Sequence, residues 1–307
     1  MNVNKQNVEE TFKLLADIAH EKTPFFADIW ERSRNEFGDP WVKEIVDNVV
    51  KIFGSLENTG SWEGAIRGYA EFALDAMRNQ KFFEANGHYR WSTLKEIQGR
   101  YYDNEDHMMK GYLPGMYLSH YLWPHHFKLL EFFRKEVLSD LAPPPALFYD
   151  VGIGSGMYSR EVLRGVPNVR GVGFDVSPYS VEFTSNVLQA YGLQDRYEFV
   201  LGDIFTSELP WKTADLVVSQ EVLEHLEEPE RFTQILYRLT KVGGKAYITA
   251  AVNAGHSDHI YLFRSPEEVK TLLTKVGWKI LKWRAEYGYT GAPIEVTPCI
   301  AHFLCER

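Results

Sequence analysis

A glycine-rich stretch carries the most informative residues of the sequence. Residues 148–157 read FYDVGIGSGM, so that large apolar residues lead into Asp150 and then into a run with a glycine at every second position. These glycines are Gly152, Gly154 and Gly156. Glycines let the backbone turn tightly and approach a ligand closely, which suits a nucleotide cradle between a strand and a helix. The dinucleotide fingerprint needs a glycine where Met157 stands, and a carboxylate at Asp150 would repel a pyrophosphate. The stretch therefore favours a nucleoside that carries a sulfonium or ammonium charge.

Histidines form the second group of residues whose type suits chemistry, because imidazole titrates near neutral pH. His256 and His259 follow a strand-like run, and loops after the strands of a parallel sheet line its ligand crevice. We predict His259 as a general base, with His256 as the second candidate. The alternative is that both only bind backbone groups of their own loop. Three further histidines in a helical stretch are weaker candidates: His120, His125 and His126.

The elements that would position these residues follow from the pattern of apolar residues. From residue 146 onward, short apolar runs alternate with helical stretches, which is typical of a parallel α/β sheet. We expect strands at Leu147–Val151, Val169–Phe174, Tyr197–Leu201, Leu216–Ser219 and Ala246–Ala250. We expect helices at Tyr158–Leu163, Pro178–Tyr191, Pro229–Leu239 and Ser265–Val276. Two last strand-like runs, Lys279–Ala285 and Ile300–Cys305, have no helix between them and predict an antiparallel terminal hairpin.

The residues before this sheet read as helices instead. Apolar residues recur at helical spacing in residues 8–18 and 42–52, and further helices are expected at 62–77 and 117–141. Pro124 should break the last of these helices, and Tyr112–Gly115 is expected to be a turn. A stiff connector at residues 143–145, Pro-Pro-Pro, sets the expected domain boundary, with domains at 1–142 and 146–307.

Composition narrows the class of protein. The 307 residues carry a formal net charge of −9 and are 45% hydrophobic, as in soluble globular proteins. This charge argues against a nucleic-acid partner. The two cysteines give neither a disulfide framework nor a metal spacing, and the N-terminus lacks a signal peptide pattern. We therefore expect a cytoplasmic protein with no membrane partner.

Five features in register resemble the class I S-adenosylmethionine-dependent methyltransferase family. The first is Asp-Val-Gly-x-Gly-x-Gly after a strand, and the next three are Gly171–Asp175, Gly202–Phe205 and Asp215–Leu226. The fifth is Val242–Gly244, which resembles the turn into strand five. The terminal hairpin is a further feature of that family's fold. The resemblance covers residues 146–307. It implies a Rossmann-like seven-stranded sheet, mostly parallel with an antiparallel terminal hairpin, preceded here by an all-helical domain.

The resemblance also implies a set of cofactor-binding residues. Asp175, with Val176 beside it, would accept hydrogen bonds from the ribose hydroxyls, and Asp203 and Ile204 would hold the adenine ring. Gln220 and Glu221 would lie at the amino acid end of the cofactor, together with Asp150 and the three glycines. The tyrosine-rich segment 101–121 would form a lid, from which Tyr117 could reach the cofactor carboxylate. His225 would anchor its loop.

These expectations lead to one functional hypothesis. We predict an S-adenosylmethionine-dependent methyltransferase that acts on a small molecule, at an oxygen of a secondary metabolite or of a polyketide-like or quinone-like compound. Nitrogen or carbon acceptors stay open. So do a cofactor-binding regulatory protein without transfer activity and a nicotinamide oxidoreductase, the latter disfavoured by Met157 and Asp150.

Two further expectations concern metals and assembly. His256-x-x-His259 offers metal-ligating side chains, but metal-dependent relatives in this family place acids just after strand four, where Ser219-Gln220-Glu221 stands. We therefore predict no catalytic metal. The helical domain would serve as a lid or as a surface for a homodimer.

Overall fold

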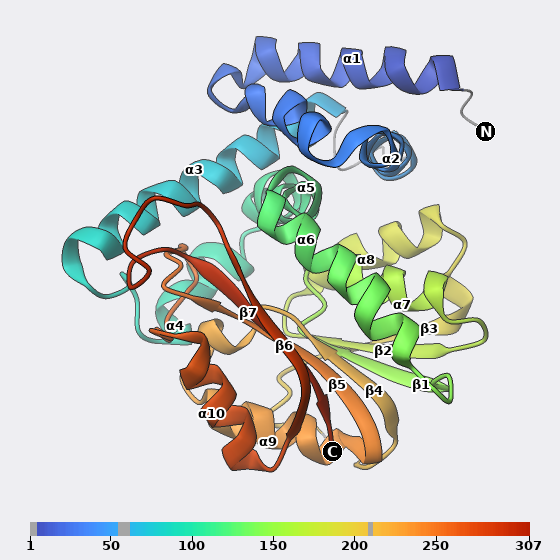
Figure 1. Ribbon diagram of the computed structural model, residues 1–307, viewed down its shortest axis with the longest axis vertical. Helices are drawn as coiled ribbons and strands as arrows, with labels where there is room; N and C mark the ends of the chain where they lie inside the picture. The colour runs from blue at the N-terminus through green and yellow to red at the C-terminus, as the bar shows by residue number, and fades with distance from the viewer. Residues whose placement is uncertain (1–4, 55–61, 208–210) are drawn as a thin grey trace.

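The structure is a computed structural model that describes residues 5–54, 62–207 and 211–307. It places a helical layer on top of a twisted sheet that is itself flanked by helices (Figure 1). The helical layer contains α1 (Lys5–Lys22), α2 (Asp28–Phe53), α3 (Trp62–Asn86), α5 (Leu113–Leu122) and α6 (Pro124–Phe132). Shorter helical segments join α3 to α5: α4 (Leu94–Ile97), η2 (Gln98–Tyr102) and η3 (His107–Tyr112).

The sheet has seven strands in the order β3-β2-β1-β4-β5-β7-β6. The strands are β1 (Leu147–Val151), β2 (Arg170–Asp175), β3 (Tyr197–Leu201), β4 (Ala214–Ser219), β5 (Thr240–Val252), β6 (Lys279–Tyr287) and β7 (Cys299–Glu306). The first five are paired in parallel, and β7 is antiparallel to both β5 and β6. The Rossmann-like fold with its antiparallel hairpin is therefore confirmed.

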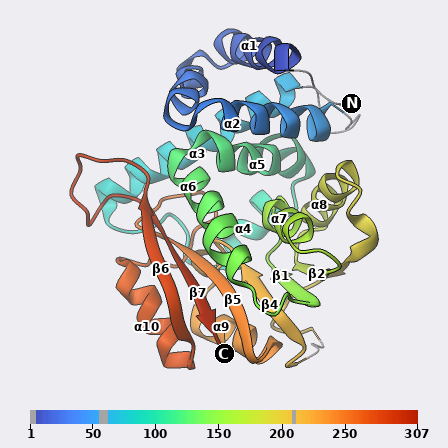
Figure 2. The same cartoon turned by 45° about the vertical axis from the view of Figure 1, so that its right-hand side comes forward.

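Helices cover both faces of the sheet (Figure 2). One face packs against α6, α7 (Met157–Gly165) and α8 (Pro178–Ala190), and the other packs against α9 (Pro229–Leu239) and α10 (Pro266–Val276). The first face shares a continuous apolar core with the helical layer, in which Phe132 and Phe133 contact Tyr247 of β5. Because apolar burial is the main favourable term in folding, this shared core fixes the helical layer above the sheet.

Buried polar bonds add to this attachment. Arg160 of α7 has no exposed side-chain surface and bonds to Asn48 of α2, Tyr117 of α5 and its neighbour Glu161. Glu161 in turn accepts a hydrogen bond from Nε of Arg134, 2.6 Å away. A buried charge is tolerated only where it is paired and hydrogen-bonded, and here the partners come from both layers.

One local expectation is wrong. Tyr112–Gly115 forms no turn, because η3 runs directly into α5. Pro114 is accepted there because it occupies the first helical turn, where a missing N–H costs nothing. Gly115 is required by packing: a Cβ atom on it would lie 2.4 Å from Cβ of Phe72 in α3. The Pro-Gly pair therefore marks a close crossing of two helices.

Most boundaries in the second half lie within two residues of the expected ones, whereas α2 and α3 of the helical layer are much longer than the segments expected at 42–52 and 62–77. Trp123 separates α5 from α6, whose first residue is Pro124, and Gly54 caps the end of α2. β5 is longer than expected at both ends, and Gly243 within it has a positive φ of 76°. In the described part of the chain, every helix is too short or too polar to cross a membrane.

Candidate active site

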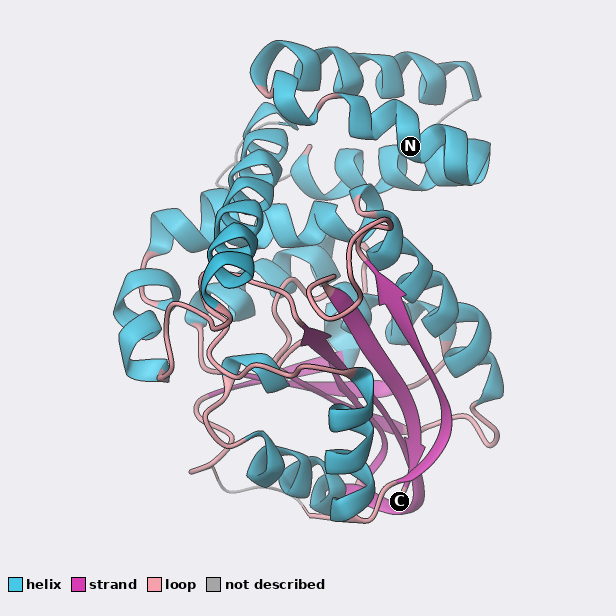
Figure 3. Ribbon diagram, turned by 60° about the vertical axis from the view of Figure 1, so that its left-hand side comes forward, coloured by secondary structure: helices cyan, strands magenta, loops and turns pink. Residues whose placement is uncertain are grey.

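A cavity of about 680 Å³ lies at the carboxyl ends of the parallel strands, under the helical layer. Its floor is made by the loops that follow β1, β2, β3, β4 and β5. Its roof includes α3, which lies against these loops in Figure 3. Parallel strands end at the same edge of a sheet, which is why loops far apart in the sequence meet here.

The glycine loop after β1 forms one wall of the cavity. Gly152, Gly154 and Gly156 all have positive φ angles, of 81°, 50° and 71°. Other residues rarely adopt this conformation, so the turn requires glycine. The turn places the backbone N–H of Gly154 3.2 Å from Oδ2 of Asp175, to which it donates. The carboxylate of Asp175 is thus fixed beside the loop, and it also accepts from the N–H of Ser177 at 2.8 Å.

Two acids of this wall have shifted pKa values. Burial raises the pKa of Asp150 to about 7, although Oγ of Ser159 donates to its carboxylate at 2.6 Å. Burial also raises the pKa of Asp175 to about 6, and backbone N–H groups limit the rise. A bound cation would favour the charged form of Asp150.

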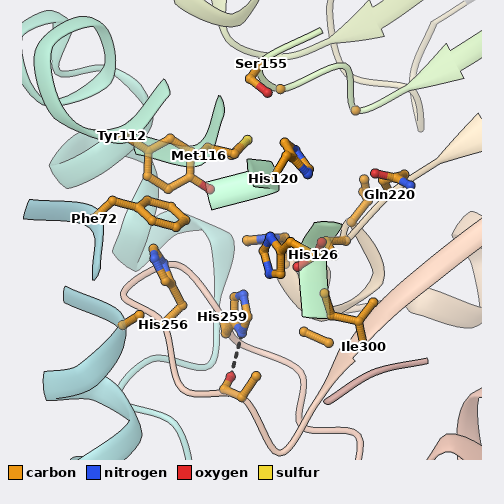
Figure 4. Close-up of a pocket in the computed structure, with 18 of the residues that line it drawn as sticks. Phe72, Tyr112, Met116, His120, His126, Ser155, Gln220, His256, His259 and Ile300 are labelled. Carbon is orange, nitrogen blue, oxygen red and sulfur yellow. Dashed lines mark hydrogen bonds between the residues drawn. The ribbon is translucent and has the colours of Figure 1, made fainter. Parts of the chain in front are cut away.

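A loop after β5 forms the opposite wall and presents a hydrogen-bonded histidine. Nδ1 of His256 lies 2.7 Å from Oδ1 of Asp258, and the other carboxylate oxygen accepts from the hydroxyls of Tyr112 at 2.6 Å and Tyr102 at 3.1 Å. Since a carboxylate only accepts, Nδ1 of His256 carries the proton. Its Nε2 is buried, has no hydrogen-bond partner among the described residues, and belongs to a residue that lines the cavity (Figure 4).

The charges around His256 determine its protonation. Burial alone would lower its pKa, but the charge and hydrogen bond of Asp258, together with Asp75, raise the pKa above its usual value. His259 differs, because its Nδ1–H donates to the carbonyl oxygen of Ala254 at 2.7 Å. Burial and the neighbouring His225 hold the pKa of His259 well below its usual value.

Two acids after β4 complete this end of the site. Glu221 lines the cavity, and burial raises its pKa to about 7. Glu224 is fully buried in η7 (Leu223–His225), and burial together with the charge of Glu221 raises its pKa well above the usual value. His225 donates from Nδ1 to the backbone carbonyl of Asp258 at 3.0 Å, so it ties the two loops together.

Known proteins resemble this chain in its second half. Residues 149–248 match the protein family described as "Methyltransferase domain". The chain contains a class I S-adenosylmethionine-dependent methyltransferase domain. The cofactor of this family is S-adenosylmethionine.

Two curated relatives match part of this chain. An ajmaline N-methyltransferase of Rauvolfia serpentina is 27% identical over 148 residues, which are 48% of this chain and 50% of that protein. A ubiquinone biosynthesis O-methyltransferase of Cupriavidus pinatubonensis is 27% identical over 154 residues, which are 44% of this chain and 61% of that protein. The chain thus matches the first of these relatives over half of that protein's length.

Solved structures extend the likeness of the fold to the helical layer. The mitomycin 7-O-methyltransferase has a TM-score of 0.54 and 17% identity, and the match covers 80% of this chain and 71% of that one. A phosphoethanolamine N-methyltransferase of Haemonchus contortus has a TM-score of 0.51 and 13% identity, over 71% of this chain and 60% of that one. At such identity these matches concern the fold alone.

The methyltransferase domain contains unsatisfied groups that fit the cofactor. Nε2 of Gln220 and the hydroxyl of Tyr158 are buried atoms of residues that line the cavity; they lie near each other, and neither makes a hydrogen bond of normal geometry with a described residue. Buried donors without partners are costly, and the carboxylate of the cofactor would satisfy both. On the glycine loop, a Cβ atom at Gly154 would lie 3.1 Å from Sδ of Met116, so a side chain there would narrow the cavity.

Most residues predicted to bind the cofactor meet at this wall. The cavity is lined by Asp150, Gly152, Gly154, Asp175, Val176, Asp203, Ile204, Gln220 and Glu221. Two predicted residues are outside the lining. Tyr117 is fully buried and donates to Oδ1 of Asn48 at 2.9 Å, so it joins helices instead. Gly156 serves the turn, where a Cβ atom would lie 2.6 Å from Cγ2 of Thr184.

Four residues of the site were given no individual role from the sequence, and one of them is Tyr158 of α7. Tyr102 and Tyr112 come from the segment whose tyrosine content predicted a lid, and Asp258 lies between the two predicted histidines. The tyrosine content of the segment could be seen in the sequence. The hydrogen bond between Tyr112 and Asp258 could not be predicted, because the two residues are 146 positions apart.

Proposed function

We propose that this protein transfers the methyl group of S-adenosylmethionine to an oxygen atom of a small, largely apolar acceptor. The observation that carries the proposal is the unpartnered, buried Nε2 of His256, whose ring is oriented by Asp258 on the wall opposite the glycine loop. A nitrogen held in this way can take a proton from an acceptor hydroxyl.

The residues of the glycine wall would bind the cofactor. Asp175 would accept hydrogen bonds from both ribose hydroxyls, while Asp203 and Ile204 would hold the adenine ring. Gln220 and Tyr158 would donate to the cofactor carboxylate. Asp150, near the base of the loop, favours the positively charged donor by its own charge. When bound, S-adenosylmethionine supplies a methyl group that its sulfonium charge already activates.

The protein then has three tasks in the transfer. It aligns the acceptor oxygen with the methyl carbon, excludes water and removes one proton. The oxygen forms a bond to the methyl carbon as the bond between that carbon and sulfur breaks, and the electron pair of the broken bond stays on sulfur. The hydroxyl proton passes to Nε2 of His256 and leaves later to solvent.

The acceptor end of the cavity is largely apolar. Side chains from α3, from the α5–α6 junction and from β7 line it, among them Phe72, Met77, Trp123 and Ile300. Two hydrogen bonds hold the loop between β6 and β7 against α3: Nε2 of Gln80 donates to the carbonyl of Val296 at 3.1 Å, and the hydroxyl of Tyr289 donates to Glu84 at 3.0 Å. This lining suits a flat phenol-like or enol-like compound.

The test uses the full chain with methyl-labelled S-adenosylmethionine and a panel of phenols, quinols, enols and amines. We expect label to enter a phenol or enol, at an oxygen identified by the NMR spectrum of the product. His256→Gln should reduce kcat by about 10²- to 10⁴-fold, with unchanged cofactor affinity. His20→Gln, in the distant helix α1, is the matched control. Wild-type turnover by His256→Gln would refute the base, and cofactor binding without any transfer would favour a regulatory protein.

A further inference from the structure

Three side chains that the proposed transfer does not use form a cluster next to the cavity. They are Glu224 and His225 from η7, after β4, and His259 from the loop after β5. One potential ligand atom from each lies within 4.8 Å of those of the other two. His225 and His259 line the cavity, while Glu224 lies buried. Carboxylate and imidazole groups are the ligands of many catalytic metal ions.

The two histidines are oriented as metal ligands are. Nδ1–H of His225 donates to the carbonyl of Asp258 at 3.0 Å, and Nδ1–H of His259 donates to the carbonyl of Ala254 at 2.7 Å. Carbonyl oxygens only accept, so the protons lie on Nδ1 and the lone pairs lie on Nε2. Metal-binding histidines almost always donate their second nitrogen to such an acceptor, which fixes both tautomer and ring.

Glu224 is the observation that points to a ligand. Its side chain is fully buried, and neither carboxylate oxygen makes a hydrogen bond of normal geometry with a described residue; the donors close to it are the backbone N–H groups of Glu224 and Ala251. A buried carboxyl group without well-formed hydrogen bonds is rare and costly. No ion pair with a lysine or arginine is found for Glu221, Glu224 or Asp258 across residues 5–54, 62–207 and 211–307. A cation bound at this place would give these buried acids the partner that no lysine or arginine among these residues provides.

We propose that Glu224, His225 and His259 bind one divalent transition-metal ion, of which zinc is the best match. Zinc commonly takes two histidines and one glutamate in catalytic sites and leaves a fourth position open. Ligand atoms around such an ion are about 3.4 Å apart, given bond lengths of about 2.0–2.1 Å. Side-chain movements of about 1 Å would therefore close the cluster around the metal.

The open position would face the cavity, because two of the three ligands line it. There the ion would hold the acceptor oxygen and make its hydroxyl more acidic, next to the base His256. The ring centroids of His256 and His259 are 5.5 Å apart, which leaves the ligand and the base on neighbouring positions of one wall. This role in catalysis rests on the proposed function, whereas metal binding itself does not.

The first experiment measures binding alone. The full chain is stripped with EDTA, dialysed, and titrated with ZnCl2 in a calorimeter, and bound zinc is counted by mass spectrometry after gel filtration. We expect one ion per chain, and weaker binding of MgCl2, which prefers oxygen ligands. Glu224→Gln and His259→Ala should each weaken zinc binding by at least about 100-fold, and His20→Ala should not. No bound zinc in the wild type, or equal binding by Glu224→Gln, would overturn the site.

Folding and coordination are checked separately. Circular dichroism identifies a variant that lost zinc because it unfolded. Glu224→Gln keeps the shape of the side chain, so it is the variant for which we expect the least unfolding. The visible spectrum of the Co²⁺ form should be altered by Glu224→Gln and unaltered by His20→Ala. An identical Co²⁺ spectrum in Glu224→Gln would also overturn the site.

Transfer assays distinguish this proposal from the previous one. If the stripped chain transfers methyl groups at the wild-type rate and zinc does not bind, the metal site is wrong and the methyltransferase stands. If zinc binds with the expected losses in the variants but no acceptor is methylated, the metal site stands and the methyl transfer fails.

Discussion

Asp258 holds His256 in one orientation: Oδ1 of the carboxylate lies 2.7 Å from Nδ1 of the ring. The same carboxylate accepts hydrogen bonds from Tyr102 and Tyr112 of the helical layer. Asp258 therefore favours the tautomer of His256 that has its proton on Nδ1 and its lone pair on Nε2. This carboxylate is hydrogen-bonded to groups from both layers of the molecule.

Asp258→Asn should remove this control over the ring. The amide can present its NH2 to Nδ1, which favours the tautomer with the proton on Nε2 and so blocks the base. We expect kcat to fall by about 10²- to 10⁴-fold, while the dissociation constant of S-adenosylmethionine changes little. Steady-state kinetics and calorimetry measure the two quantities. A variant with wild-type kcat would show that the ring needs no orientation by Asp258.

Asp175→Ala should weaken cofactor binding strongly. A carboxylate that accepts from two hydroxyls makes charge-assisted hydrogen bonds worth about 1.5–3 kcal/mol each, so the dissociation constant should rise by about 100-fold or more. Asp203→Ala, at the exposed adenine end, should have a smaller effect because water can replace its bonds. Calorimetric titration with S-adenosylmethionine checks both, and an unchanged constant in Asp175→Ala would remove it from the cofactor site.

The fold of the second half could be predicted from the sequence in nearly all its elements. The buried strand β1 is a nearly continuous apolar run, and its ends coincide with the expected residues. The ends of the edge strand β3 also coincide with the expected residues, although this strand is mostly only partly buried. The glycine loop could also be predicted, because positive φ angles favour glycine and the sequence shows where the glycines are. Local rules of this kind need no knowledge of distant contacts.

Within the site, only the residues whose positions follow from such local rules could be predicted from the sequence. The base is a different case, because His256 and His259 are the same residue type only three positions apart, and from the sequence we predict His259. The structure favours His256, because it bonds to a carboxylate while His259 bonds to a carbonyl. The Glu224 cluster was missed because a buried carboxyl without well-formed hydrogen bonds is a property of three-dimensional packing.

Cofactor affinity should depend on pH through the glycine wall. Burial raises the pKa of Asp150 to about 7 and that of Asp175 to about 6, and the charged forms bind the cationic cofactor. The dissociation constant should therefore rise as the pH falls from about 8 to about 5, where both groups take up protons. Calorimetry across this range measures the effect. In Asp150→Asn, the dissociation constant should change only near pH 6, where Asp175 titrates. A dissociation constant that does not vary with pH in the wild type would contradict the assignment of both acids.

The stability of the free chain should follow the opposite trend for these two groups. Their folded pKa values exceed the usual value of 3.8, so the folded state binds more protons than the unfolded state between these values. Their contribution to stability is complete below about pH 4 and is lost as the pH rises through about 6 and 7. In urea unfolding, Asp150→Asn should reduce the loss of stability between pH 5 and pH 8 relative to the wild type. An equal loss in both proteins would show that Asp150 is not neutral in the free protein.

The crossing of α3 and α5 should couple stability to acceptor binding. Gly115 packs so closely that a Cβ atom would lie 2.4 Å from Cβ of Phe72 and 2.7 Å from the carbonyl oxygen of Gly68. Gly115→Ala must push the helices apart, so we expect the free energy of unfolding to fall by about 1–3 kcal/mol. Phe72 lines the cavity and would move with α3, so KM for the acceptor should rise while cofactor affinity is kept.

Gly99→Ala provides the matched control for this crossing. A Cβ atom at Gly99 would meet no atom within 4 Å, and Gly99 is not among the residues with positive φ. The change should therefore alter stability by less than about 0.5 kcal/mol and leave KM unchanged. Urea unfolding and acceptor kinetics on the two variants separate a general effect of alanine from the specific contact. If Gly115→Ala is as stable as Gly99→Ala and has the same KM, then the crossing does not set the position of Phe72 at the acceptor end.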